Sequence, residues 1–224
     1  LDLSIGTLLL FLKRWLKMYN NFPNIGYVSK KLSSTTIKKL NSYIKNPRQD
    51  AKHELAGNIS GSFFIEDKKD WFFNNELLPL IKEYEENTPD FKLSPIILTK
   101  DCNYTLNKLW VNFQKKYEFN PVHYHSGVFS FVIWMKIPAS FKKEKNLAFI
   151  KNSKNPFTNT FSFVYVNSIG TISTKDYNLE PEDEGTILFF TSTMQHTVYP
   201  FYTSDKMRVS ISGNISLNPN QIVQ

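Results

Sequence analysis

The stretch EFNPVHYHSGVFSFVIWMKIP, residues 118–138, places two histidines two positions apart, immediately before a run that is apolar almost throughout. His123 and His125 follow Pro121, and proline within a sheet is common at the first residue of a strand. Side chains at positions i and i+2 of a strand lie on the same face, so we expect the two imidazoles to point the same way. The stretch therefore predicts a strand with paired histidines, followed by a buried strand.

Similar segments recur from residue 96 to the end of the chain. They are rich in Phe, Val, Ile, Tyr and Thr and are separated by Asn, Gly, Pro and Ser, which is typical of short antiparallel strands. The expected strand segments are KLWVNFQKKYEF, VFSFVIWMKIP, NLAFIKN, TFSFVYVN, GTILFFTS and RVSISGNISL. About eight such strands would form a mainly β core, as a sandwich, a jelly roll or a barrel.

Residues 1–95 have a different, helical and mixed character. SSTTIKKLNSYIKN, residues 33–46, has capping residues before an apolar pattern that Pro47 ends, and NELLPLIKEYEEN, residues 75–87, is a second helical run. We expect residues 1–95 to pack on a core formed by residues 96–224, giving one domain overall.

An apolar stretch, IGTLLLFL, lies near the N-terminus and is too short to span a bilayer. The residues at helical spacing are Leu8, Leu9, Leu12, Leu16 and Tyr19. They favour an amphipathic helix that covers the domain over a signal peptide, with docking on a membrane or a partner as the alternative.

The composition narrows the possible partners and the compartment. The chain has 224 residues and a formal net charge of +7, but its lysines alternate with acids in segments such as IEDKKDWFF. A solvated surface explains this pattern best, and an anionic partner such as nucleic acid is possible but unsupported by a clustered basic stripe. Cys102 is the single cysteine, which excludes an internal disulfide and a multi-cysteine zinc site and fits a cytoplasmic location.

A third histidine is a candidate to complete a metal site. Two imidazoles on one face can chelate a transition metal, and a third ligand is then needed. His196 follows the apolar strand segment GTILFFTS after a short polar stretch, and distant strands can converge in a closed antiparallel sheet. His53, the fourth histidine, lies in a helical or loop context, and we expect it on the surface.

Arg208 and Ser210 suggest an acid-binding position next to these histidines. They are two residues apart in the last strand segment, so they share a face. A guanidinium can clamp a carboxylate with two hydrogen bonds, and a neighbouring hydroxyl can add another. Because a buried arginine without a carboxylate is costly, we expect either a bound acid or an internal Asp or Glu beside Arg208.

The order H-x-H, distal His, then R-x-S about a dozen residues later resembles the double-stranded β-helix oxygenases that depend on Fe(II) and 2-oxoglutarate. LWVNFQKKYEFNPVHYHSGVFSFVIWMKIP, EGTILFFTSTMQHTVYPFY and RVSISGNI are similar, in particular, to uncharacterised oxygenases of this superfamily in marine cyanophages. The resemblance covers most of residues 96–217. It implies a double-stranded β-helix (jelly roll) core flanked by helices, and a host cytoplasm if the chain is phage-encoded.

The resemblance also implies roles for individual residues. His123, His125 and His196 would hold Fe(II), and Arg208 with Ser210 would bind the C5 carboxylate of 2-oxoglutarate. The enzyme would oxidise a C–H bond of a protein, peptide or small molecule while 2-oxoglutarate is decarboxylated to succinate. Asn112 and Gln114, which share a face of an earlier strand, would contact co-substrate or substrate, or else be exposed strand residues.

One position departs from the usual pattern of this superfamily. Most members have H-x-D/E, and this chain has His125 in the acid position. A three-histidine dioxygenase of the cupin type, which does not use 2-oxoglutarate, is therefore an alternative. A second alternative is that His125 does not bind the metal and that water or an acid elsewhere in the chain is the third ligand. A third is a non-catalytic β-sandwich binding or virion-associated module of a phage, in which the histidines and Arg208 only pack or pair. The sequence indicates neither the primary substrate nor the oligomeric state.

Overall fold

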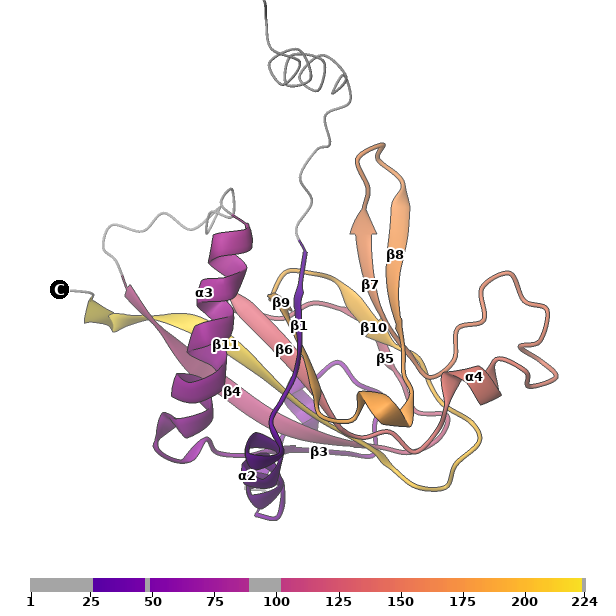
Figure 1. The fold of residues 1–224 in the computed structure, drawn as a ribbon, viewed down its shortest axis with the longest axis horizontal. Helices are drawn as coiled ribbons and strands as arrows, with labels where there is room; N and C mark the ends of the chain where they lie inside the picture. The colour runs from indigo at the N-terminus through magenta and orange to yellow at the C-terminus, as the bar shows by residue number, and fades with distance from the viewer. Residues whose placement is uncertain (1–25, 47–48, 89–101, 223–224) are drawn as a thin grey trace, which may run out of the picture.

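A computed structural model of the chain describes residues 26–46, 49–88 and 102–222 (Figure 1). The amphipathic helix predicted near the N-terminus lies outside these residues. Most regular structure is strand, arranged in two antiparallel sheets, with a few helices. The prediction of a mainly β jelly roll flanked by helices is confirmed. No helix within the described ranges is both long and apolar enough to cross a membrane.

The larger sheet has seven strands in the order β1-β9-β6-β11-β4-β3-β2. In chain order they are β1 Val28–Lys31, β2 Gln49–Asp50, β3 Gly61–Phe64, β4 Cys102–Gln114, β6 Phe129–Lys136, β9 Thr186–Thr191 and β11 Arg208–Ile222. Three of these strands come from the segment before residue 95, so that segment adds strands to the sheet as well as helices.

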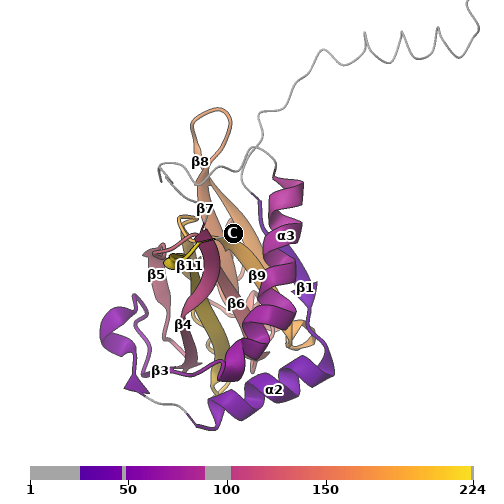
Figure 2. The same ribbon diagram turned by 90° about the vertical axis from the view of Figure 1, so that its left-hand side faces the viewer.

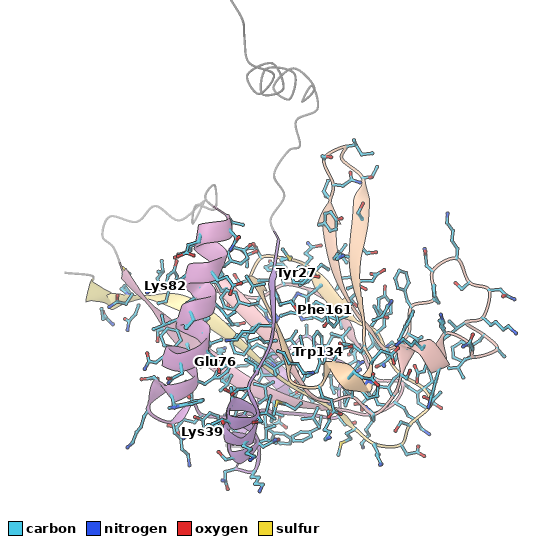
Figure 3. The ribbon with its side chains drawn as sticks, in the orientation of Figure 1. Tyr27, Lys39, Glu76, Lys82, Trp134 and Phe161 are labelled. Carbon is cyan, nitrogen blue, oxygen red and sulfur yellow. The ribbon has the colours of Figure 1, made fainter. Side chains whose placement is uncertain are left out.

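The smaller sheet has four strands in the order β5-β10-β7-β8. They are β5 Asn120–His123, β7 Thr160–Val166, β8 Ile172–Asn178 and β10 His196–Val198. Val132, Trp134 and Leu188 of the larger sheet pack against Phe161 and Phe163 of the smaller one. Trp134 and Phe161 lie in the interior between the sheets (Figure 3), with ring centroids 5.9 Å apart.

Helices cover the other face of the larger sheet (Figure 2). They are α2 Ser34–Ile44, the π-helix η3 Phe73–Leu77 and α3 Leu78–Asn87; the chain also forms short turns η1 Lys52–Glu54, η2 Lys68–Asp70, η4 Pro181–Asp183 and α4 Phe141–Glu144. The β6 run is apolar almost throughout because both of its faces are buried. Phe129, Phe131 and Ile133 face the helices, and Val132 and Trp134 face the second sheet.

The predicted helices agree with the structure. Ser33 caps α2, where its Oγ accepts a hydrogen bond of 3.1 Å from the backbone N–H of Thr36. The second helical run divides into η3 and α3, and Thr88 ends it.

The expectation of a strand at NLAFIKN, residues 146–152, is wrong. This segment forms turns in which the backbone N–H groups of Ile150 and Lys151 both donate to the carbonyl of Leu147. Its apolar residues do not follow the two-residue period of a strand: the inward-facing Leu147 and Ile150 are three positions apart, and Phe149 between them is 69% exposed. Five strands were not predicted: the short strands β1, β2 and β3 before residue 95, the polar edge strand β8, and β10, which has only three residues.

The close packing around Gly213 in the larger sheet can be tested by substitution. It lies on β11 between β4 and β6, and an added Cβ would come 2.6 Å from Cζ of Phe131 and 2.7 Å from the carbonyl oxygen of Lys108. We expect Gly213→Ala to lower the free energy of unfolding by ~1–3 kcal/mol, measured by urea denaturation. Gly26→Ala is the control, since no atom lies within 4 Å of its added Cβ. Equal stability of the two variants would contradict this packing.

Candidate active site

The pairing of two short strands positions two of the three histidines. His123 is the last residue of β5 and His196 is the first residue of β10, and the two are direct partners across this antiparallel pair. His125 lies beyond the end of β5, where its backbone N–H donates a 2.8 Å hydrogen bond to the carbonyl of Ser192. The backbone thus holds all three residues beside the turn that leads into β10.

The three imidazoles converge as metal ligands would. One ring nitrogen from each of His123, His125 and His196 lies within 4.8 Å of the others, and Nε2 of His125 is 3.2 Å from Nε2 of His196. Metal–imidazole bonds of about 2.0–2.1 Å at right angles put ligand nitrogens about 3 Å apart. The donor set and its spacing therefore fit a transition-metal ion.

Backbone carbonyls select the tautomers of two of these rings. Nδ1 of His123 lies 2.7 Å from the carbonyl oxygen of Pro121, and Nδ1 of His196 lies 2.9 Å from that of Met194. Because a carbonyl can only accept, the proton is on Nδ1 and the lone pair is on Nε2. An Nδ1–H bonded to a carbonyl is a common support for an imidazole that binds metal through Nε2.

Burial keeps the three rings neutral. It lowers the pKa of His196 well below its usual value, with the charges of His123 and His125 adding to the effect. Burial, together with the charge of His123, lowers the pKa of His125 to about 3, and burial also lowers the pKa of His123. Since metal ions bind the deprotonated nitrogen, the rings are in the ligand form over the physiological pH range.

Arg208 lies at the start of β11 with only 2% of its surface exposed. Its Nε and Nη2 both donate to Oε1 of Gln114, at 3.2 and 2.8 Å, Nη1 donates to Oδ1 of Asn159 at 2.9 Å, and Nη2 donates to the carbonyl of Tyr199 at 2.9 Å. The guanidinium also lies 5.4 Å from the ring centre of Phe201. Four of its five N–H groups therefore have protein acceptors.

The charge of Arg208 has no direct counter-ion in the described part of the chain. No carboxylate oxygen there lies within ion-pair distance of the guanidinium. Burial lowers the pKa of Arg208 to about 9, and the more distant carboxylate of Glu144 acts in the opposite direction. Of the two partners expected from the sequence, an internal acid does not lie at ion-pair distance among the described residues.

The remaining predicted residues are strand partners of one another. Arg208 pairs with Gln114, and Ser210 pairs with Asn112, along β11 and β4. Both polar atoms of the Gln114 side chain are hydrogen-bonded: its Oε1 accepts from Arg208, and its Nε2 donates to the carbonyl of Glu118. Oδ1 of Asn112 accepts a 2.8 Å hydrogen bond from Ser62.

One cavity brings these groups together, between the two sheets. Its lining contains the three histidines, Arg208, Ser210, Asn112 and Gln114, together with Trp134, Phe161 and Val198. His53 lies elsewhere on the surface, as predicted, with 64% of its side chain exposed.

Sequence reasoning missed several residues of this site. Asn159, which orients Arg208, adopts a positive φ of 43° just before β7 and donates through Nδ2 to the carbonyls of Ala139 and Leu179. No spacing pattern marks it. The segment 55–59 also lines the cavity, through Leu55, Ala56, Gly57 and Ile59.

Several aromatic residues lie near the histidines and Arg208 in the sequence, and of these Trp134 lines the cavity directly: Tyr117, Phe119, Tyr124, Trp134, Tyr199, Phe201 and Tyr202. Phe201 packs beneath the guanidinium of Arg208. Tyr117, Phe119 and Tyr124 are exposed on the surface, by 61%, 40% and 65%.

Metal loading tests the histidine cluster. We expect one Fe(II) per chain after anaerobic reconstitution and desalting, measured by metal analysis. His196→Ala should lose stoichiometric binding, because two imidazoles hold iron weakly. His53→Ala is the matched control and should bind as the wild type does, since this ring lies outside the cluster. Equal iron content in both variants would exclude the cluster as the metal site.

Comparison with known proteins agrees with this geometry. Residues 108–214 match the family model described as "Putative 2OG-Fe(II) oxygenase". The match covers slightly less than half of the chain and includes the three histidines and Arg208. No curated protein sequence matches the chain.

Solved structures support the fold. An oxidoreductase of the 2OG-Fe(II) oxygenase family from Burkholderia pseudomallei superposes with a TM-score of 0.53 at 10% identity, covering 96% of this chain and 93% of that one. The α-ketoglutarate-dependent carbocyclase SnoK of nogalamycin biosynthesis gives 0.51 at 10% identity, covering 87% and 80%. The predicted cofactors, Fe(II) and 2-oxoglutarate, agree with the matched family and with the three-histidine cluster. In matched sequence and in fold, the chain is similar to the 2OG-Fe(II) oxygenases.

Proposed function

We propose that the protein is an oxygenase that uses Fe(II) and 2-oxoglutarate to oxidise a C–H bond of a protein, peptide or small molecule. One observation carries the proposal: a cluster of three neutral imidazoles lines the same cavity as a buried guanidinium that has no counter-ion among the described residues. 2-Oxoglutarate is a dianion that can chelate a metal at one end and present a carboxylate at the other. The cavity offers a suitable partner for each end.

In this proposal His123, His125 and His196 hold the iron, and Arg208 with Ser210 binds the C5 carboxylate of 2-oxoglutarate. The remaining N–H of the guanidinium and the hydroxyl of Ser210 supply two donors for that carboxylate. When bound, iron supplies the oxygen chemistry that couples decarboxylation of 2-oxoglutarate to oxidation of the substrate. The chain's residues supply the binding geometry and the exclusion of water.

Gln114 and Asn112 have different places in this scheme. Gln114 acts through Arg208, because its Oε1 accepts two hydrogen bonds from the guanidinium and so fixes its plane. Asn112 lines the cavity beside Ser210 with its Oδ1 held by Ser62, which leaves its amide N–H groups as donors toward the co-substrate or substrate. We therefore assign Gln114 a positioning role and Asn112 a binding role.

The two alternatives account for less of the cavity. A cupin-type dioxygenase with three histidines has no need of a buried, uncompensated arginine. A non-catalytic module would have to bear the cost of burying that charge without a ligand to offset it. Encoding by a phage and a location in the host cytoplasm remain part of the proposal, as does a single domain with its core at residues 96–224.

A titration with 2-oxoglutarate tests the proposed function. Anaerobic Fe(II) protein should develop the weak visible charge-transfer band of a 2-oxoglutarate chelate. In Arg208→Ala the concentration needed for half of the band should rise by at least about 100-fold, since a charge-assisted pair is lost. Ser210→Ala should raise it by about 3- to 10-fold.

The same titration separates the alternatives. Stoichiometric iron without the band would favour a cupin-type enzyme, and oxygen uptake indifferent to 2-oxoglutarate would support that reading. Absence of stoichiometric iron would leave a β-sandwich with structural histidines. A band of unchanged affinity in Arg208→Ala would overturn the assignment of Arg208 while retaining the metal site.

Gln114→Glu tests whether the lone charge of Arg208 is what attracts the co-substrate. The new carboxylate would lie where Oε1 now accepts two hydrogen bonds, and it would neutralise the guanidinium internally. We expect weaker binding of 2-oxoglutarate by about tenfold or more, with iron content unchanged. Gln49→Glu, on the exposed strand β2, adds the same charge far from the cavity and should leave the affinity unchanged. Wild-type affinity in Gln114→Glu would contradict this role of the charge.

A further inference from the structure

The chain makes a basic excursion, residues 141–157, between β6 and β7 at one end of the fold (Figure 1). It begins with α4 and continues through turns. The excursion contains five lysines and one acid, Glu144. All five lysines are exposed: Lys142, Lys143, Lys145, Lys151 and Lys154. Within the described residues none of them forms an ion pair.

Glu144 does not offset these charges at the surface. It is fully buried, where Oε1 accepts hydrogen bonds from the backbone N–H groups of Tyr202 and Thr203 and from the hydroxyl of Thr203, at 2.7–2.8 Å. Its Oε2 accepts from the hydroxyl of Thr158. The only acid of the excursion is thus used to attach it to the loop after β10, and its outer surface carries positive charge alone.

A row of aromatic rings adjoins this basic surface. Phe149, 69% exposed, packs edge-on against Tyr202 with ring centroids 5.0 Å apart. Tyr202 in turn lies 5.7 Å from Tyr117, which is 61% exposed. The three rings come from three separate segments, which the hydrogen bond from the backbone N–H of Tyr117 to the carbonyl of Phe201 and the bonds to Glu144 hold together.

Further lysines and amides border the row. Lys115 is exposed, and Lys116 lies 5.5 Å from the ring centre of Tyr117 while pairing with Asp205 at 2.6 Å. The exposed side chains of Asn146, Asn152 and Asn155 stand among the lysines of the excursion. The surface therefore combines cations, the exposed aromatic side chains of Phe149 and Tyr117, and amide donors and acceptors.

We infer that this surface binds single-stranded nucleic acid. Lysines that track a phosphate backbone, combined with aromatic side chains on which bases stack, are the usual means of binding single strands without sequence preference. The sequence alone did not predict a basic stripe, because Lys115 and Lys116 are distant in sequence from the excursion. The fold brings them to the same aromatic row.

An anionic membrane surface fits these residues less well. Interfacial binding requires a continuous apolar face that enters the lipid. In the excursion Ile150 is buried and Leu147 is half-buried, so Phe149 is the single large apolar side chain classed as exposed there. Its other exposed residues are polar or charged, apart from Ala148. This composition suits a hydrated polyanion with stacking bases.

Fluorescence anisotropy with a fluorescein-labelled oligothymidylate of about 15 nucleotides tests the inference at low salt. Lys143→Glu/Lys151→Glu/Lys154→Glu should weaken binding by at least tenfold. The matched control is Lys38→Glu/Lys68→Glu/Lys82→Glu, which changes the net charge equally on exposed lysines of α2, η2 and α3. Lys82 lies on the opposite side of the molecule (Figure 3), and the control should weaken binding less than threefold. Phe149→Ala should weaken binding by about fivefold or more.

Three results would overturn the inference. The first is an equal loss in the two triple variants, which would indicate attraction by net charge alone. The second is binding of duplex DNA at least as tight as that of the oligothymidylate, with no effect of Phe149→Ala. The third is Phe149-dependent binding to phosphatidylglycerol vesicles without binding to the oligothymidylate. None of these measurements needs iron or 2-oxoglutarate, so the result is independent of the proposed function.

Discussion

The buried positive charge of Arg208 is the constraint around which the site is built. Removing a guanidinium from water costs several kcal/mol unless its N–H groups find acceptors. Here the acceptors come from β4, from the residue that precedes β7 and from the residue that follows β10. Gln114 belongs to the larger sheet, while Asn159 and Tyr199 flank strands of the smaller one. The hydrogen bonds of the Arg208 guanidinium therefore connect the two sheets at this end of the cavity.

The strand β10 connects this constraint to the histidine cluster. It has only three residues, beginning with His196 and ending with Val198. Tyr199, the next residue, gives its carbonyl to Arg208. At the other end of β10, His196 pairs with His123 of the neighbouring strand β5. A short stretch of extended chain thus sets the separation between the imidazoles and the guanidinium. Changing this separation would break the pairing of His196 with His123 or the hydrogen bond from Arg208 to the carbonyl of Tyr199.

Much of this arrangement was predictable from local spacing. The i, i+2 period put Arg208 with Ser210 and Asn112 with Gln114, and the structure adds that the two pairs are direct neighbours across β11 and β4. The H-x-H pattern predicted that His123 and His125 lie close together, and they do, although His125 lies past the end of β5. The helices at residues 33–46 and 75–87 carried capping and periodic signals that the fold retains.

What the sequence could not predict depends on contacts between distant segments. Asn159 has its role because the carbonyls of Ala139 and Leu179 hold its amide, and no periodicity encodes that. The strand β8 is polar because it lies at the edge of its sheet, and the strands β1 to β3 are short. None of these four strands therefore shows an apolar alternation in the sequence. The prediction of a strand at NLAFIKN was wrong for the converse reason. Its apolar composition is that of a strand, but it follows directly on α4, and local backbone hydrogen bonds from Leu147 to Glu144 and from Ile150 and Lys151 to Leu147 continue the turns.

The replacement of an acid by His125 changes the electrostatics of the proposed site in a direction that fits the rest of the cavity. A divalent ion held by three neutral imidazoles keeps its full charge of +2, whereas a carboxylate ligand would reduce it to +1. Arg208 adds a second cationic centre, with neutral oxygens rather than a carboxylate as its partners. The cavity would then be positive at both ends, and a dianion with a carboxylate at each end is the kind of ligand that neutralises both. Among the described residues no carboxylate lies with the candidate metal ligands or within ion-pair distance of Arg208, and the acidic co-substrate of the proposal would supply the negative charge at both ends.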